Sequence, residues 1–144
     1  MAATINFYNE QISFTLKNKK KIRQWIIRCA AAEGFEIGEI TYLFGNDEYV
    51  LSANRQYLQH DYLTDILTFE YSENGVLQGD IIISVDRVKE NAQQFGTTME
   101  NEMLRVIIHG ILHLCGYKDK TKKEAAVMRA KEEACLREYY NNIL

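Results

Sequence analysis

Hydrophobic and polar residues follow two different periods along this chain, and the change from one period to the other marks the predicted elements. Over short stretches, such as residues 4–8, apolar and polar residues alternate, which is typical of a β-strand with one buried face. Elsewhere apolar residues return every three or four positions, as between Ile22 and Ala30, which is typical of an amphipathic α-helix. The predicted strands span 4–8, 37–44, 64–71 and 79–85. The predicted helices span 18–33, 47–58, 86–96, 98–114 and 121–140.

Turn and capping signals indicate how these elements are joined. Asn74-Gly75 is a strong hairpin signal, so the third and fourth strands should pair antiparallel. Asp86 is a good cap for the helix that follows the fourth strand, and Thr121 with Glu124 makes a capping box for the last helix. The earlier alternation of strands and helices favours parallel pairing. The sequence therefore predicts an α+β fold: a mixed four-stranded sheet with one antiparallel strand, covered by about five helices, with helix 98–114 central.

Length and composition agree with one domain over residues 1–144. A chain of 144 residues with 47% hydrophobic residues can bury a sizeable core. It contains no proline, no repeat and no linker-like tract. We therefore expect one compact domain.

The predicted helix 98–114 carries a pattern typical of a metal site. His109 and His113 are four residues apart, so their side chains lie on one face of the helix, one turn apart. Gly116 can take the left-handed conformation that ends a helix, which would let Asp119 swing back toward the same ion. Two imidazoles and one carboxylate suit a single zinc ion and leave one tetrahedral position open, as in catalytic zinc sites. A histidine pair alone is a weak signal, and surface or core histidines are its ordinary explanation.

The same spacing occurs in the zinc peptidase motif H-E-x-x-H-x-x-G-x-x-H, with Asp119 at the third ligand position. Gly110, however, stands where the peptidase carries its general-base glutamate. A zinc metallopeptidase is therefore the least favoured of the possible functions.

The segment HGILHLCGYKD, residues 109–119, resembles the signature HGxLHLxGYDH of the YbeY family of zinc-dependent endoribonucleases. It departs from that signature at Lys118 and at Asp119, where the family has its third histidine. Leu58 stands where the family carries a functionally implicated arginine. Further family blocks are matched at residues 53–58, 64–69 and 79–84.

This resemblance implies a single-strand-specific endoribonuclease that acts in ribosomal RNA maturation and ribosome quality control. It implies that His109, His113 and Asp119 act in catalysis through one bound Zn²⁺. The expected partners are ribosomal RNA and the small ribosomal subunit, with ribosomal proteins or a GTPase as further candidates. Because Leu58 and Asp119 both depart from the family pattern, a non-catalytic ribosome-assembly factor that keeps the fold and the metal is an alternative.

The net charge of −3 means that any RNA binding must be local. Cationic residues are candidates for contacting phosphates, because such contacts supply affinity that does not depend on base sequence. An exposed charge without a function is the alternative for each of them. The candidates are Lys118, Lys120, Lys122 and Lys123 beside Asp119, together with Arg55 and Arg105.

Three polar residues at predicted strand ends, Thr64, Asp65 and Asp80, could line the same cleft or serve as turn and capping residues. His60 is expected to be an exposed loop residue. Cys115 points away from His113 on an ideal helix and is expected to be a small core residue.

The cysteines and the hydropathy pattern suggest a location. Cys29, Cys115 and Cys135 are odd in number and widely spaced, which favours reduced thiols in the cytoplasm. No apolar stretch approaches the length of a membrane span, and residues 1–20 lack the apolar centre of a secretion signal. We therefore expect a cytoplasmic protein without membrane contact.

Overall fold

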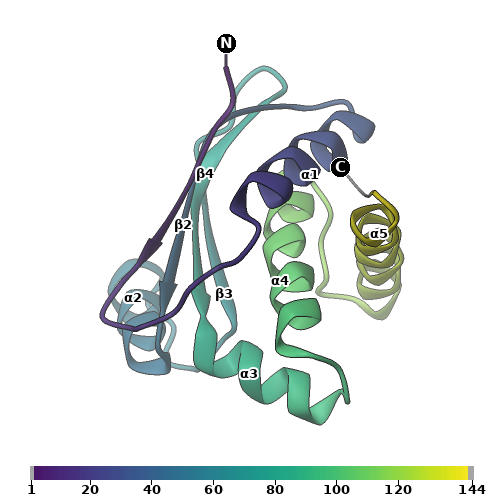
Figure 1. Cartoon of the computed structure of the whole chain (residues 1–144). Helices are drawn as coiled ribbons and strands as arrows, with labels where there is room; N and C mark the ends of the chain where they lie inside the picture. Colours follow the sequence, from purple (N-terminus) through teal and green to yellow (C-terminus); the bar gives the residue numbers. More distant parts are fainter. Residues whose placement is uncertain (1, 143–144) are drawn as a thin grey trace.

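The computed structural model describes residues 2–142, which form one mixed four-stranded sheet with five helices (Figure 1). The strand order is β1-β2-β4-β3, with β1, β2 and β4 parallel and β3 antiparallel to β4. This confirms the predicted α+β fold class. The strands are β1 (Thr4–Asn9), β2 (Glu36–Gly45), β3 (Ile66–Glu70) and β4 (Val76–Ser84).

The helices cover both faces of the sheet unequally. Figure 1 shows α2 on one face and α1 and α4 on the other, with α5 packed on the outer side of α4. None of the described helices is both long and apolar enough to cross a membrane. The helices are α1 (Lys19–Ala32), α2 (Asp47–Leu58), α3 (Val85–Gln94), α4 (Met99–Leu114) and α5 (Lys122–Asn141).

The predicted hairpin between β3 and β4 is confirmed. Asn74 and Gly75 have φ angles of 52° and 79°, the left-handed conformations that such a turn requires. The two strands pair from Ile66 with Ile83 to Glu70 with Gly79.

One predicted cap is wrong. Ser84, not Asp86, caps α3, because its hydroxyl accepts a hydrogen bond from the backbone N–H of Arg87 at 3.2 Å. Asp86 lies in the first turn of the helix instead. Here β4 runs directly into α3, so the last strand residue is also the cap. The capping box of Thr121 and Glu124 at the start of α5 is confirmed.

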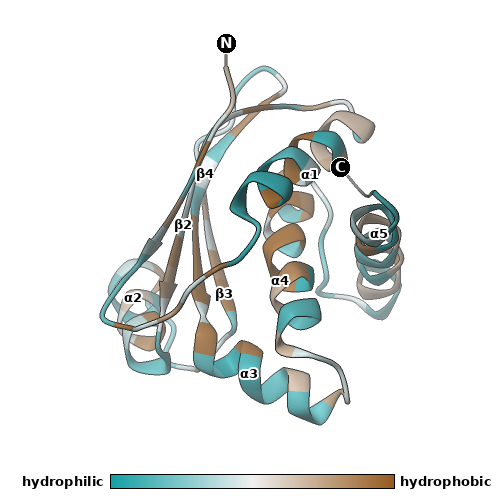
Figure 2. Cartoon of the chain, in the orientation of Figure 1, coloured by the Kyte–Doolittle hydropathy of each residue, from teal (hydrophilic) through white to brown (hydrophobic). Residues whose placement is uncertain are grey.

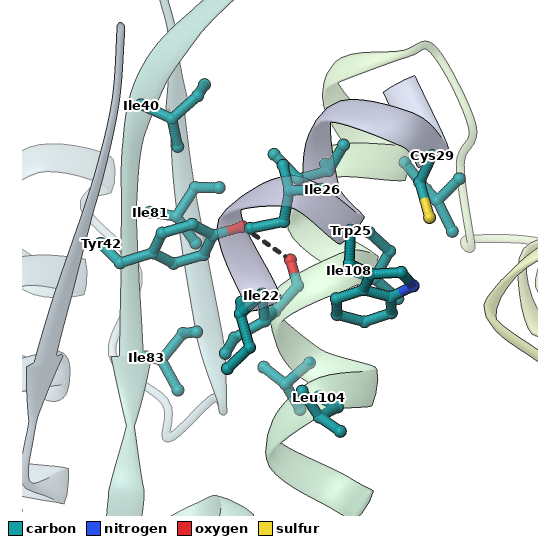
Figure 3. Packing of buried hydrophobic residues seen from close by; sticks show 14 of the residues in the cluster. Ile22, Trp25, Ile26, Cys29, Ile40, Tyr42, Ile81, Ile83, Leu104 and Ile108 are labelled. Carbon is teal, nitrogen blue, oxygen red and sulfur yellow. Dashed lines mark hydrogen bonds between the residues drawn. The ribbon is translucent and has the colours of Figure 1, made fainter. Parts of the chain in front are cut away.

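The main core lies between the sheet and α1, α4 and α5. Figure 3 shows Ile22 and Ile26 of α1 near strand residues such as Ile81, with Trp25 of α1 and Ile108 of α4 in the same cluster but farther from the strands. The buried hydroxyl of Tyr42 donates a hydrogen bond to the carbonyl of Ile107, 2.9 Å away, which satisfies a polar group that would otherwise be costly to bury. Figure 2 shows that α4 is largely hydrophobic through its middle, whereas α5 is more hydrophilic. α4 is therefore covered on two sides, by the sheet and by α5.

A smaller core lies on the other face of the sheet. Val50 and Ala53 of α2 pack with Leu67 of β3 and Ile82 of β4. Because side chains alternate along a strand, Ile82 faces α2 while Ile81 belongs to the main core. α2 is thereby held against β3 and β4.

Gly110 sets how closely α4 approaches the sheet. A Cβ atom at this position would lie 3.0 Å from Ile81 Cδ1 and 3.2 Å from Ile66 Cδ1. The Gly110 side of α4 thus faces β3 and β4.

Candidate functional site

A cleft of about 680 Å³ lies beside α4. Its lining residues come from four parts of the chain: residues 58–68 from the end of α2 into β3, Phe95 at the end of α3, one side of α4, and α5 with the loop that precedes it. His109, His113 and Asp119, the three predicted ligands, all line this cleft. The structure therefore places all three in one cleft.

The turn after α4 returns Asp119 to the helix. Gly116 has a φ angle of 109°, so the predicted left-handed glycine is confirmed. The N–H groups of Gly116 and Tyr117 donate to the carbonyls of His113 and Leu112 at 3.0 and 3.1 Å. After this reversal, Oδ2 of Asp119 lies 3.4 Å from Nε2 of His109.

The loop after α4 is also tied to α1. The hydroxyl of Tyr117 donates to Glu33 at 2.6 Å, and the ammonium of Lys131 donates to the same carboxylate at 3.1 Å. Burial alone would raise the pKa of Glu33, but these two donors lower it below its usual value. Glu33 therefore stays ionised and fixes the loop that carries Asp119.

A buried carboxylate holds the ring of His109. Nδ1 of His109 lies 2.6 Å from Oε2 of Glu132, which is only 5% exposed. Since an ionised carboxylate only accepts hydrogen bonds, Nδ1 carries the proton and donates, and Nε2 is turned toward Asp119. Arg105 donates to the other oxygen of Glu132 at 3.1 Å and to Glu133 at 2.5 Å. The ring orientation is thus set by the chain Glu133, Arg105, Glu132, His109.

Charges in the cleft shift the pKa values of several groups. Burial lowers the pKa of His109, but the carboxylates of Glu132, Asp119 and Asp65 raise it, and the net shift is upward. Burial raises the pKa of Asp65, against the smaller opposing effect of His109. Burial likewise raises the pKa of Glu102, against the effect of Arg105. Burial is therefore the main reason why the pKa values of these two carboxyl groups are raised.

The residues fit a metal ion in part. In a tetrahedral zinc site with bonds of about 2.0 to 2.2 Å, two donor atoms lie about 3.3 to 3.5 Å apart. The 3.4 Å between His109 Nε2 and Asp119 Oδ2 matches that spacing. His113 lines the same cleft but does not complete a set: within residues 2–142 no three or more histidine, cysteine or acidic side chains already form a group that could hold a metal ion.

The predicted RNA-binding cations are divided among several places. Lys120 lines the cleft, whereas Lys118 and Lys123 line a separate hollow beside Tyr117. Lys122 is exposed and lines neither. Arg55 is exposed on α2 and paired with Asp61, and Arg105 lines the cleft within its network of carboxylates.

Glu132 and Arg129 line the cleft but were not predicted from the sequence. On α5 the residues Met128, Glu132 and Leu136 share one face at four-residue spacing, and all three are buried. A carboxylate within a buried apolar stripe was the available signal for Glu132. Arg129 lines the cleft, is exposed, and forms no hydrogen bond or ion pair with another described residue. For Arg129 no sequence signal separates it from other exposed charges.

The remaining candidates also have definite places. Thr64 and Asp65 line the cleft, whereas Asp80 lies within β4 and accepts a hydrogen bond from the hydroxyl of Tyr71 at 3.2 Å. His60 is an exposed loop residue, as predicted, and it also lines the cleft. Cys115 is half-buried against the main core, as expected, and burial raises its pKa to about 12.

Histidine, carboxylates and arginine that share one open cleft, with several shifted pKa values, are typical of a hydrolase active site. Gly110 faces the sheet and not this cleft, so a base at that position, as in the peptidase motif, has no place here. The chain belongs to the endoribonuclease YbeY family, whose model matches residues 4–140.

Individual relatives agree with this assignment. The chain is 51% identical to endoribonuclease YbeY of Cytophaga hutchinsonii over 134 residues, which cover 92% of this chain and 94% of that protein. It is 49% identical to endoribonuclease YbeY of Porphyromonas gingivalis, covering 93% of this chain and 89% of that one. The solution structure of TM1509 from Thermotoga maritima is similar, with a TM-score of 0.66, 27% identity, and coverage of 96% and 90% of the two chains.

Proposed function

We propose that this protein cleaves single-stranded RNA by hydrolysis, using one zinc ion held by His109, His113 and Asp119. Membership of a family of endoribonucleases supports RNA cleavage as the reaction. The single observation that supports the metal is the orientation of His109: Nδ1 is fixed by Glu132 while Nε2 faces Asp119. A carboxylate behind a histidine in this way is the usual arrangement around metal-binding histidines.

A divalent ion in such a site supplies Lewis acidity for attack on a phosphodiester. The protein's own residues do the rest. Glu132 and Arg105 keep the His109 ring in place, and the turn at Gly116 presents Asp119. Asp65 is our candidate for accepting a proton on its carboxylate, because its raised pKa lies nearer to neutral pH than that of an ordinary aspartate.

RNA would be held from the α5 side of the cleft. Lys120 and Arg129 line that side and are both exposed, so they can contact phosphates. Arg105 is already neutralised by Glu132 and Glu133 and serves to position Glu132 instead.

Ribosomal RNA, as part of the small ribosomal subunit, is the substrate that we infer, with the whole chain of residues 1–144 acting as one nuclease domain. We place this activity in the cytoplasm, in keeping with the free thiols of Cys29, Cys115 and Cys135.

The decisive experiment combines metal analysis with RNA cleavage. Wild-type protein should carry about one zinc ion per chain and cut single-stranded ribosomal RNA fragments. His109→Ala, His113→Ala and Asp119→Ala should each lose zinc and cleavage, while Asp80→Ala, which removes a carboxylate outside the cleft, should keep both. Full zinc in the Asp119→Ala protein would show that another group is the third ligand.

A non-catalytic assembly factor is the second candidate, and one observation favours it. Leu58 lines the cleft at the position where the family motif has arginine, so this wall lacks that positive charge. Zinc-loaded protein that binds RNA without giving products would support the assembly factor and contradict the nuclease.

A further inference from the structure

We propose that His60 and Tyr62 form a stacking site for one unpaired base of the RNA strand that lies in the cleft. This inference rests on the proposed function for the identity of the ligand. The stacking site would contact an RNA base, whereas Lys120 and Arg129 would contact phosphates and His109, His113 and Asp119 would hold the metal ion.

The two rings already form a stack. Their centroids are 5.3 Å apart with an angle of 22° between the planes, and the Tyr62 hydroxyl lies 3.1 Å from Nδ1 of His60. Both residues line the cleft, yet 56% of Tyr62 is exposed. A large exposed ring beside a cleft is a surface on which a further flat group can stack.

The loop that carries these rings is held in place from α2. Asn54, which is fully buried, donates from its side-chain amide to the carbonyl of Tyr62 at 3.0 Å. The carbonyl of Asn54 accepts a hydrogen bond from the N–H of His60 at 3.2 Å. Because the backbone is fixed at both ring-bearing residues, base binding would not require ordering of the loop.

The two walls of the cleft differ in character, in a way that suits a nucleotide. The segment with the rings also brings Leu58 to the cleft, with Thr64 and Asp65 further along, whereas Lys120 and Arg129 supply positive charge from the α5 side. Aromatic side chains stack on bases of any sequence, and cations contact phosphates. A base that is paired within an RNA double helix cannot stack on a protein ring, so this site favours unpaired RNA.

The test uses the full-length, metal-free protein, so that binding is measured without cleavage. The probe is a short single-stranded RNA with 2-aminopurine at one position, whose fluorescence is quenched when the base stacks, and affinity is measured by fluorescence anisotropy. Tyr62→Ala should weaken binding about 5- to 150-fold and abolish the quenching. Tyr62→Phe keeps the ring and should bind nearly as wild type. Tyr71→Ala, which removes an exposed tyrosine outside the cleft, should have no effect.

A probe with an abasic site in place of 2-aminopurine gives the second comparison. Wild-type protein should lose affinity for the abasic probe, and Tyr62→Ala should lose nothing further, because the same contact is already gone. Equal losses on the abasic probe in both proteins, with both still folded by circular dichroism, would overturn the stacking site. Zinc-loaded wild type is assayed for cleavage in parallel. If wild type cleaves RNA but Tyr62→Ala changes neither affinity nor quenching, the stacking site alone is refuted. If the base stacks on wild type but zinc-loaded wild type does not cleave RNA, the nuclease alone is refuted.

Discussion

At the scale of single residues, the most informative side chain of the cleft is Glu132. Its two carboxylate oxygens are used separately, one by His109 at 2.6 Å and the other by Arg105 at 3.1 Å. A buried carboxylate that is satisfied on both sides is rigid, and so is the imidazole that it holds. Glu132 is thus a positioning residue for His109, and it would act on the proposed metal ion only through that ring.

Glu132→Gln should weaken zinc binding about 10- to 100-fold while the protein stays folded. An amide at this position keeps the shape but not the charge, so it holds the His109 ring less firmly. The measurement is competition with a chromogenic chelator, together with nitrogen chemical shifts of His109 that report its tautomer. Glu133→Gln is the matched control, since Glu133 also contacts Arg105 but not His109. Equal losses in both variants would assign the effect to Arg105 and not to Glu132.

Asp65 should make the metal-free protein less stable as the pH rises. Because burial raises the folded-state pKa of Asp65, the native state binds this proton more tightly than the unfolded state does. The free energy of unfolding therefore falls as the pH rises from the unfolded value of 3.8 through the raised pKa. Asp65→Asn should remove this fall and unfold at higher urea concentration at pH 7.

The same Asp65→Asn protein should lose about 100-fold or more of its RNA cleavage if Asp65 accepts the proton. A gain in stability with a loss of activity is the combination expected of a catalytic group. Asp80→Asn, at a carboxylate outside the cleft, serves as the control for both measurements. Unchanged cleavage by the Asp65→Asn protein would remove Asp65 from the mechanism.

At the scale of elements, the two sides of α4 near Gly110 explain how this helix is placed. One side of the helix presses on β3 and β4 at Gly110, and the other side carries His109 into the cleft. Consecutive helix residues differ by about 100° in direction, so neighbours in sequence serve the core and the site in turn. The close approach of α4 to the sheet is therefore part of what positions His109.

Gly110→Glu should destabilise the fold by about 3 kcal/mol or more and should confer no peptidase activity. The new side chain would begin 3.0 Å from Ile81 Cδ1 and would bring an unpaired charge into the core. Urea unfolding measures the loss, and a casein assay with and without chelator tests for peptidase activity. Chelator-sensitive casein cleavage by a stably folded variant would contradict this orientation of residue 110.

Local signals in the sequence predicted the elements well, and the site less completely. The Asn74-Gly75 turn, the capping box at Thr121 and the left-handed Gly116 depend on neighbouring residues alone, and all three are confirmed. The capping role given to Asp86 was wrong because Ser84 ends a strand and begins a helix at once, which removes the loop that the prediction assumed.

The cleft depends instead on contacts between distant segments. His109, His113 and Asp119 lie within eleven residues and line the same cleft, and their role as one set of metal ligands stays a prediction. Glu132 lies 23 residues from His109 and reaches it only because α5 packs on α4. His60 and Tyr62 join the same cleft through the anchoring of their loop by Asn54. Such tertiary contacts leave no periodic pattern in the sequence.

At the scale of the whole molecule, charge is distributed unevenly over a protein with a net charge of −3. The four lysines within residues 118–123 look like one basic patch in the sequence, but the loop after α4 directs them to different surfaces. Lys120 enters the cleft, while Lys118 and Lys123 line the hollow beside Tyr117. Lys120 and Arg129 therefore form one pair of cations in the cleft, and Lys118 and Lys123 form a second pair outside it. The two pairs carry the same charge in different places.

The double variant Lys120→Ala with Arg129→Ala should bind single-stranded RNA more weakly and with less dependence on salt. Each phosphate contact contributes about 0.7 to the slope of log affinity against log salt concentration for single strands, so losing two contacts should reduce the slope by about 1.4. Anisotropy titrations of metal-free protein over a range of salt concentrations give this slope. The pair Lys118→Ala with Lys123→Ala makes the same change in net charge and should leave the slope nearly unchanged, because it lies outside the cleft. If both double variants lowered the slope equally, RNA would be responding to the overall charge of the protein. The proposal that the RNA strand binds in the cleft would then be wrong.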